Sequence, residues 1–527
     1  MPTTVLGRGS SDRDRSHTLR DWAHLYEAAD QLTARCQTGE AAAVLEEIGG
    51  LLAEAEAADV AEVLNRLRYV VALANLHLGD LDRAVEACDQ MIAQGGDGGD
   101  PAWASSAYAL RGIARSERGD QLSAVDDLVD AAVLLDDARP TGQPYVYAAD
   151  GIGLGYLDLR LYELALDTYE LATPLVTRPG LNLPRMFHLF HHMLVEVSWG
   201  LELERLEEPD AARAHFGAAL ALADGAEPLP TTGTHAWTLR FRALVGLCHA
   251  MIGATDLAIN SLESTAEALA EGELDEEAMA RMGLARAYGQ VGDLQRAHAE
   301  ADRAEHLVDG HDRQLGLSIA WERQRLAQAA GPSPAAAVVS EYASRLEHER
   351  WDDRVRFAAE TRGRLRSEIE LRAARKMSAE YLTDPQTGAA NRRHLELRLP
   401  EMVSRAQTHE ETVALAFVDL DSDTTLEDLV SIGASLRTSA GPDGFVARYG
   451  GSEFVVVLPR QTARQLADIV DSVIGSRRVD GAARPRVGVA SAVRPPSVAG
   501  LMAAADEALL AARRAGGGIR LAVSTPE

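Results

Sequence analysis

The stretch ARYGGSEF, residues 447–454, carries the clearest structural signal of this chain. It joins two β-branched runs, FVARYG at 445–450 and EFVVVLP at 453–459, through a Gly-Gly pair. Two such runs around a short glycine turn predict a β-hairpin. Similar runs, AFVDLD at 416–421 and RVGVASA at 486–492, predict neighbouring strands.

Segments with helical periodicity lie between these strands. We expect helices over 394–407, 425–438, 461–476 and 499–515. Strands that alternate with helices in this way predict an α/β domain with a central sheet.

Four motifs in this region resemble, in order, those of the GGDEF family. DPQTGAANRR at 384–393 is similar to the opening motif of that family, FVDLD at 417–421 to its first metal strand, ARYGGSEF to its signature hairpin, and ADEALLAAR at 505–513 to its last helix. The resemblance covers 381–523 and implies a nucleotidyl cyclase-like α/β fold. It also implies a chemistry in which two domains, each holding GTP, face each other while metal ions neutralise the phosphates.

The resemblance implies site residues by their position in these motifs. Metal ligands are expected at Asp419 and Glu453, with Mg²⁺ as the cofactor if a nucleotide is bound. The nucleotide-binding candidates are Arg448, Gly450, Gly451, Glu453 and Arg513. Paired glycines would let the backbone approach a nucleotide without a clash at Cβ.

Two departures from the family pattern bear on catalysis. Ser452 replaces the acid at the third signature position, and a hydroxyl supplies neither the charge nor the basicity of a carboxylate, so no catalytic residue is expected. If Leu429, Ile432, Gly433 and Leu436 are aligned with the corresponding family helix, about ten residues are missing between Asp421 and that helix. They include the donors and acceptors that would hold guanine, so selectivity for GTP should be lost.

Further departures lie near the hairpin and in the last helix. Arg513 stands where the family has a phosphate-binding lysine, and a later basic position falls on Gly517. The Arg-x-x-Asp motif for product inhibition would fall on Gly441 and Gly444, and we expect Asp443, one place away, to have no arginine partner. Binding of cyclic di-GMP at that place is therefore not expected.

Two functions remain open for this degenerate domain. One is a non-catalytic nucleotide- or protein-binding module in a regulatory protein of cyclic di-GMP signalling. The other is an active or diverged diguanylate cyclase, because Asp419 and Glu453 survive beside an intact Gly-Gly turn.

The first three hundred residues contain a repeated pattern. Glycine is followed five residues later by alanine in Gly79 to Ala84, Gly119 to Ala124, Gly253 to Ala258 and Gly292 to Ala297, with weaker copies at Gly39, Ala165 and Ala212. Successive alanines from Ala84 are 39 to 47 residues apart. Glycine can end one helix, a following Asp can cap the next, and alanine allows close packing, so each repeat predicts a helical hairpin.

Segments such as ANLHLGDLDRAVEACDQMIA resemble tetratricopeptide repeats, and we assign residues 17–330 to a repeat array of this kind. The resemblance implies a groove that binds a protein or peptide partner or a small effector; a spacer or dimerisation surface is the alternative. His188, His191 and His192 have helical spacing but no matching carboxylate or cysteine pattern, so we expect them at a helix interface or in the groove.

Residues 335–380 follow a Gly-Pro-Ser-Pro break and predict a helical linker. Leu365, Ile369, Ala373, Met377 and Tyr381 form a stripe with a spacing of four. Such a stripe suits helix packing, and a coiled-coil homodimer is one hypothesis for it.

Composition and charge bear on the binding partners, the localisation and the cysteines of the protein. Residues 378–527 contain 19 acidic and 16 basic side chains, so −25 of the net charge of −28 belongs to 1–377. A surface this negative argues against DNA and against anionic membranes. Without a signal peptide or long apolar span the protein should be cytoplasmic, with 1–16 disordered. Cys36, Cys88 and Cys248 should be buried thiols.

Overall fold

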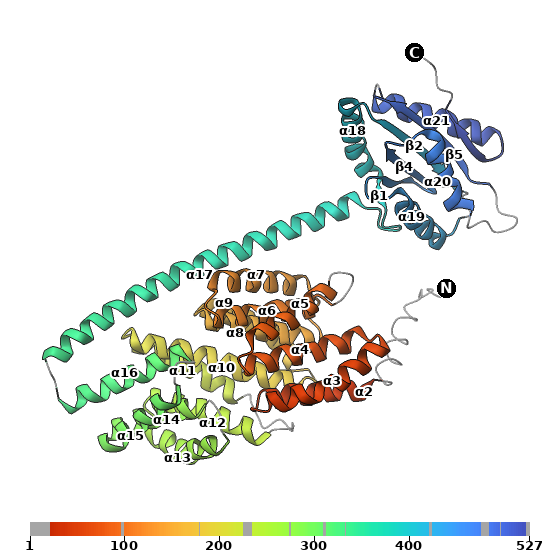
Figure 1. The fold of residues 1–527 in the computed structure, drawn as a ribbon. Helices are drawn as coiled ribbons and strands as arrows, with labels where there is room; N and C mark the ends of the chain where they lie inside the picture. The colour runs from red at the N-terminus through yellow and green to blue at the C-terminus, as the bar shows by residue number, and fades with distance from the viewer. Residues whose placement is uncertain are drawn as a thin grey trace, which may run out of the picture. The chain divides into compact units, whose positions relative to one another are not determined.

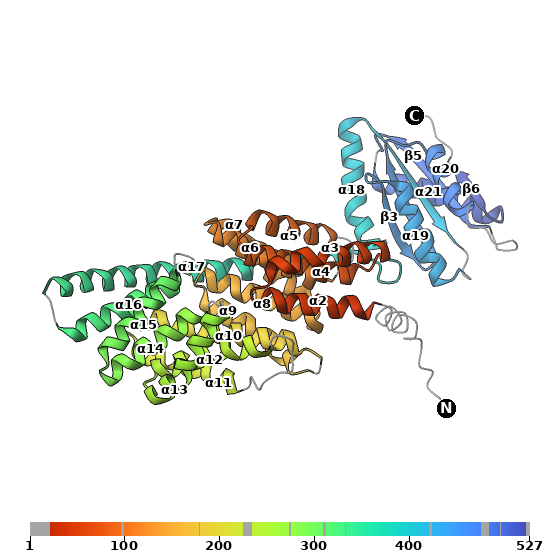
Figure 2. The ribbon, with the colours of Figure 1, turned by 60° about the horizontal axis from the view of Figure 1, so that its bottom comes forward.

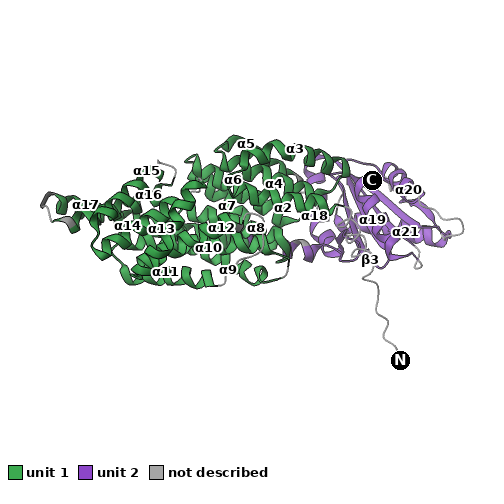
Figure 3. Ribbon diagram, turned by 90° about the horizontal axis from the view of Figure 1, so that it is seen from below, with its two compact units in different colours: residues 1–369 green, residues 370–527 purple. Residues whose placement is uncertain are grey.

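A computed structural model describes residues 22–95, 100–178, 180–224, 234–272, 276–308, 312–331, 334–420, 424–475, 484–495 and 497–522. The predicted disordered start, 1–16, lies outside these ranges. The chain divides into two compact units, 1–369 and 370–527 (Figure 3). Within the described residues, no helix is both long enough and apolar enough to span a bilayer.

The first unit is an array of paired helices (Figure 1). The pairs are α2 (Ala23–Cys36) with α3 (Ala41–Ala58), α4 (Ala61–His77) with α5 (Leu81–Gly95), α6 (Pro101–Glu117) with α7 (Gln121–Asp137), α8 (Gly142–Asp158) with α9 (Tyr162–Val176), α10 (Asn182–Arg205) with α11 (Pro209–Asp224), α12 (Thr234–Met251) with α13 (Thr255–Glu271), and α14 (Glu277–Val291) with α15 (Leu294–Val308). Helix α16 (Arg313–Ala330) follows them.

The turns of the array have the geometry that the repeat predicts. The four strong turn glycines have φ between 70° and 85°, the left-handed conformation that ends a helix. At two of the three weaker copies the same position is taken by Arg160 with φ 60° and Glu207 with φ 59°. All six repeat alanines, from Ala84 to Ala297, are fully buried between the paired helices.

Figure 2 shows the helices of the array from a second direction. Aromatic side chains connect first helices of different pairs. Tyr69 of α4 stacks on Tyr147 of α8, with ring centroids 5.0 Å apart and α6 lying between these helices in the chain. Tyr147 contacts Phe187 of α10, which contacts Trp237 of α12. The contact of Tyr69 with Tyr147 thus joins two first helices, α4 and α8, that are not successive in the chain.

The three cysteines of the array are buried thiols, as predicted. Cys36, Cys88 and Cys248 are free and buried, and burial raises the pKa of each thiol to about 12. Such thiols behave as small apolar side chains.

A long helix, α17 (Pro334–Leu382), leads into the second unit, where the described residues include four further helices and six strands that form an α/β domain. The order of a helical array, a helical linker and an α/β domain is therefore confirmed. The strands are β1 (Ala390–Asn391), β2 (Thr412–Asp419), β3 (Phe445–Gly450), β4 (Glu453–Pro459), β5 (Arg486–Val493) and β6 (Gly518–Leu521).

One six-stranded sheet, in the order β1-β3-β4-β2-β5-β6, forms the centre of this domain. The β1–β3 and β5–β6 pairs are parallel and the other three are antiparallel. Helices α19 (Leu426–Ala440) and α20 (Ala463–Gly475) bury their apolar residues against one face, and α18 (Arg392–His409) and α21 (Val498–Arg514) against the other (Figure 1). Four predicted strands and four predicted helices are thus present, whereas the edge strands β1 and β6 were not predicted.

Candidate functional site

The β2–β4 pair brings the two predicted metal acids together. Asp419 at the end of β2 is the register partner of Glu453 at the start of β4. Gly450 and Gly451 form the turn before Glu453, and Gly451 has a φ of 52°, which favours glycine. A Cβ added at either glycine would meet no atom within 4 Å, so the backbone here borders open space.

Arg513 of α21 binds both acids. Its Nε donates to Asp419 Oδ2 at 2.9 Å, and its Nη2 donates to Glu453 Oε1. Partial burial opposes the charge of Arg513, but the hydrogen bonds and charges of Asp419 and Glu453 prevail and raise its pKa above the ordinary value. The three residues therefore form one ion cluster.

Arg486 of β5 contributes a second positive charge. Its Nε lies 3.5 Å from Asp419 Oδ2, and its backbone is the register partner of Asp419 in the β2–β5 pair. Asp419 is only 7% exposed, and burial of a carboxylate is tolerated when cations pair with it. No sequence pattern pointed to Arg486, because its position depends on the register of two strands far apart in the chain.

In this structure arginine side chains bind the two acids that the resemblance assigns to a metal ion. Mg²⁺ prefers oxygen ligands in near-octahedral geometry, and one oxygen of each acid, Asp419 Oδ2 and Glu453 Oε1, already accepts from Arg513. Among the residues that the structure describes, no group of three or more His, Cys, Asp or Glu could hold a metal ion. The predicted acid pair is therefore in place, but arginine provides its charge compensation.

Ser452, at the third signature position, is engaged with the backbone. Its Oγ donates to the Leu420 carbonyl at 2.9 Å, and the Leu420 N–H donates to the Ser452 carbonyl at 3.1 Å. The hydroxyl thus closes the hairpin against the residue after Asp419. It stands where the family pattern has a carboxylate.

Arg448 belongs to a separate cluster. Its Nη1 donates to Asp384 at 3.0 Å and to Gln386 at 2.7 Å, and its Nε donates to the Gly451 carbonyl at 2.9 Å. Partial burial alone would raise the pKa of Asp384, but hydrogen bonds from Thr387 and Arg448 lower it. Arg448 therefore ties the opening motif to the glycine turn, a link that sequence reasoning missed.

The connection from β2 to α19 is short, with only residues 420–425 between them. Thr425 caps α19 by accepting from the Asp428 N–H at 3.2 Å. The buried face of α19 consists of the residues used for the family alignment, Leu429, Ile432, Gly433 and Leu436. Asp421 lies outside the described residues.

The two positions of the product-inhibition motif, Gly441 and Gly444, each disfavour a side chain, Gly444 through close contacts and Gly441 through its positive φ. A Cβ at Gly444 would lie 2.4 Å from the Ala440 carbonyl oxygen, and Gly441 ends α19 with a φ of 70°. One expectation needs correction, because Asp443 does have an arginine partner: Arg460, from the turn after β4. At Gly517, where the family has a basic side chain, a Cβ would lie 2.6 Å from Arg484 Cβ.

The histidine cluster of the array lies at a helix interface. His191 Nδ1 pairs with Asp150 of α8 at 2.9 Å, and His188 Nε2 bonds Thr173 of α9 at 3.1 Å. Burial lowers the pKa of His188 to about 4, so this side chain is neutral at pH 7. His192 stacks on Tyr169 of α9.

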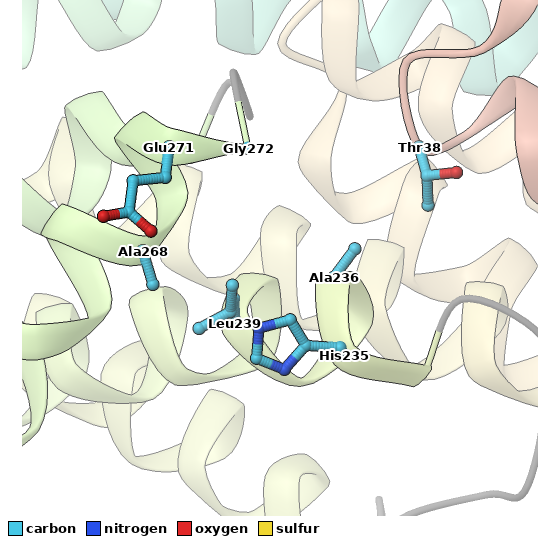
Figure 4. A pocket seen from close by; sticks show the side chains of 7 residues that line it. All are labelled: Thr38, His235, Ala236, Leu239, Ala268, Glu271 and Gly272. Carbon is cyan, nitrogen blue, oxygen red and sulfur yellow. The ribbon is translucent and has the colours of Figure 1, made fainter.

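The array also contains a small cavity of about 280 Å³ (Figure 4). The turn between α2 and α3 lies on one side, and α12 and α13 lie on the other, near the hydrogen bond from Arg240 Nη1 to the Gln37 carbonyl at 2.7 Å. It is lined by Thr38, His235, Ala236, Leu239, Ala268, Glu271 and Gly272.

Comparisons with known proteins agree with the C-terminal architecture. The family "Diguanylate cyclase, GGDEF domain" matches residues 381–518. Diguanylate cyclase DgcP of Pseudomonas aeruginosa is 26% identical over 280 residues, which cover 46% of this chain and 41% of that protein. The chain thus spans about two fifths of the length of this curated relative.

Two solved structures are also similar. The coiled coil and GGDEF domain of DgcB from Caulobacter crescentus, in complex with c-di-GMP, is 25% identical, with 33% of this chain and 99% of that chain covered and a TM-score of 0.28. The GGDEF domain of YfiN from Pseudomonas aeruginosa is 29% identical, with 27% and 94% covered and a TM-score of 0.24. Residues 381–518 are a GGDEF domain of the diguanylate cyclase family, and in this chain the domain follows a long all-helical region.

Proposed function

We propose that this chain is a regulatory protein in which a tetratricopeptide-like array binds a partner or effector and a degenerate GGDEF domain acts as a non-catalytic nucleotide- or protein-binding module. The observation that carries the proposal is the ion cluster of Arg513 with Asp419 and Glu453. In the family chemistry, metal ions at these acids neutralise phosphates and help to activate the attacking hydroxyl.

The guanidinium of Arg513 neutralises the acids without offering a coordination site. It therefore cannot activate a hydroxyl as a Lewis acid would. Ser452 adds no base, because a hydroxyl remains protonated at neutral pH and this one donates to Leu420. Both features support a domain that keeps its fold while losing the metal-dependent step.

The short connection between β2 and α19 supports weak base recognition. Six residues, 420–425, join the two elements. The resemblance implies that the family has a longer segment here, which grips guanine. A pocket without those hydrogen-bonding groups cannot discriminate GTP from other nucleotides. Any nucleotide binding should therefore rest on the exposed glycine turn and nearby arginines.

Titration calorimetry on the full chain tests this role. We expect GTP and ATP to bind with similar affinity or not at all, and cyclic di-GMP not to bind at Gly441 and Gly444. Selective, tight GTP binding would contradict the account of the shortened connection.

The alternative function is an active or diverged diguanylate cyclase. The register pairing of Asp419 with Glu453 beside an open Gly-Gly turn favours it. Under this alternative, Mg²⁺ or Mn²⁺ would displace Arg513 when nucleotide binds. Replacing Asp419 and Glu453 together with alanine should then abolish turnover of GTP, and unchanged turnover would refute their role.

A further inference from the structure

The linker helix α17 is bound along its first part to the array. Half-buried or buried positions recur every three or four residues, at 347, 351, 354, 358, 361 and 365. Beyond Ile369, the described side chains up to Tyr381 are exposed. The boundary between the two compact units also falls at Ile369, inside this helix.

Arg354 is the anchor of this contact. Its residue is only 4% exposed, and its guanidinium donates to the Arg160 carbonyl at 2.7 Å and to both carboxylate oxygens of Glu163, with one of these contacts at 2.8 Å. The cation also lies over three rings, those of Trp351, Tyr162 and Trp199, at 4.5, 5.0 and 5.6 Å. The ion pair, the hydrogen bonds and the ring contacts together hold the guanidinium in one position and orientation.

Arg354 binds at the turn between α8 and α9, which differs from the strong repeat turns in having no glycine. At this turn Arg160 takes the left-handed position that glycine takes at the strong copies, and its carbonyl accepts from Arg354. The Arg160 side chain pairs with buried Glu202 of α10, to which the Tyr162 hydroxyl also donates at 2.6 Å. The repeat turn that has Arg160 in place of glycine is therefore also the turn that binds α17.

Weaker contacts flank the anchor. Arg362 pairs with Asp167 of α9 at 2.6 Å, and Arg364 pairs with Asp126 of α7 at 2.5 Å, all four side chains being about half exposed. Exposed pairs of this kind add little stability. The apolar residues that pack on the array here are Trp351, Phe357, Ala358, Leu365 and Ile369.

The contact with the array includes the N-terminal residues of the predicted stripe, which runs from Leu365 to Tyr381 and suits helix pairing. Leu365 and Ile369 pack against the array, whereas Met377 and Tyr381 on the same stripe are 70% and 55% exposed. One face of a helix cannot pack on the array and on a second helix at the same time. Contact with the array therefore competes with any pairing through Leu365 and Ile369.

We propose that residues 351–369 of α17 form a releasable strap, clamped by Arg354 to the altered turn at Arg160, and that release lets Leu365 and Ile369 pair with the strap of a second copy. The strap couples the array to the helix that enters the GGDEF domain. The inference rests on the proposed function only in that the array binds a partner or effector. Its tests do not depend on nucleotide turnover.

Hydrogen exchange of the full chain tests the clamp. In Arg354→Ala, amides of 357–369 should exchange roughly tenfold faster or more, while those of α4 to α7 stay as in the wild type. Arg356→Ala is the matched control, since Arg356 is 71% exposed and its described contacts, with the Asp353 carboxylate and the Asp352 carbonyl, stay within its own helix. Unchanged exchange of 357–369 in Arg354→Ala would overturn the clamp.

A second variant covers the case in which Arg354→Ala unfolds the array. Asp167 and Arg362 are exposed, so the double variant Asp167→Cys/Arg362→Cys should fold, and a short bismaleimide can join the two thiols while the native cysteines remain buried. In sedimentation experiments the joined form should self-associate more weakly than the same variant capped with N-ethylmaleimide. Equal self-association of the two forms would overturn the competition between array and second copy.

Discussion

Arg513 Nε lies 2.9 Å from Asp419 Oδ2, so the acid that the GGDEF resemblance assigns to a metal ion is bound by a cation of the protein itself. The same guanidinium reaches Glu453, the second acid of the pair. A charge cluster of this kind stabilises carboxylates that are partly buried, because removing either sign alone leaves an uncompensated charge.

Removal of Arg513 should uncover a divalent-cation site. In Arg513→Ala the two carboxylates lose their nearest positive charge, and affinity for Mn²⁺ should rise about tenfold or more. Electron paramagnetic resonance of Mn²⁺ titrations measures this directly. Arg514→Ala is the control, because Arg514 is the exposed neighbour in the same helix. Equal Mn²⁺ affinity in Arg513→Ala and the wild type would show that the guanidinium does not hold the cation position.

Restoring the third signature acid should not restore synthesis. Ser452→Asp returns a carboxylate but leaves the connection at 420–425 short, so GTP remains poorly held. The variant also loses the hydrogen bond to Leu420, at a cost of about 1 kcal/mol. Mass spectrometry of the reaction mixture should find no cyclic di-GMP. Synthesis by this variant would mean that the serine, rather than the missing segment, limits the site.

The repeat alanines should not tolerate larger side chains. Ala124 is fully buried where α7 approaches α6, so Ala124→Leu should destabilise the array by roughly 1–3 kcal/mol. Leu122→Ala in the same helix is the control, because Leu122 is 79% exposed and should change stability by less than about 0.5 kcal/mol. Thermal denaturation followed by circular dichroism compares them. A smaller loss for Ala124→Leu than for Leu122→Ala would contradict the close-packing role.

Acid should weaken the array through His188. Its pKa is about 4 in the fold against about 6.5 when unfolded, so between these values the unfolded chain binds more protons. Stability is therefore full above pH 6.5 and falls by up to about 3 kcal/mol as pH drops toward 4. Melting temperatures measured from pH 7.5 to 4.5 should fall less steeply in His188→Phe than in the wild type. Parallel pH profiles would rule out this histidine as a source of the acid sensitivity.

Sequence patterns predicted the elements whose signal is local. The face of α19 with Leu429, Ile432 and Leu436 follows from apolar periodicity, and the hairpin turn follows from Gly450 and Gly451. The edge strands escaped prediction because β1 has two residues and β6 has four, too few for a pattern to emerge.

Contacts between segments far apart in the chain could not be predicted from sequence patterns. Arg486 reaches Asp419 only because β2 and β5 pair in one register, and Arg354 reaches Glu163 across 191 residues of chain. In the sequence each is an ordinary arginine among many. Their roles depend on which helix packs on which surface, and that information is not local.

The most direct measurement is turnover of GTP by the full chain with Mg²⁺ and with Mn²⁺, followed by mass spectrometry of cyclic di-GMP, with Asp419→Ala/Glu453→Ala as the blank. The account predicts that the wild type makes no more product than this blank. Cyclic di-GMP made by the wild type and absent from the double variant would contradict it.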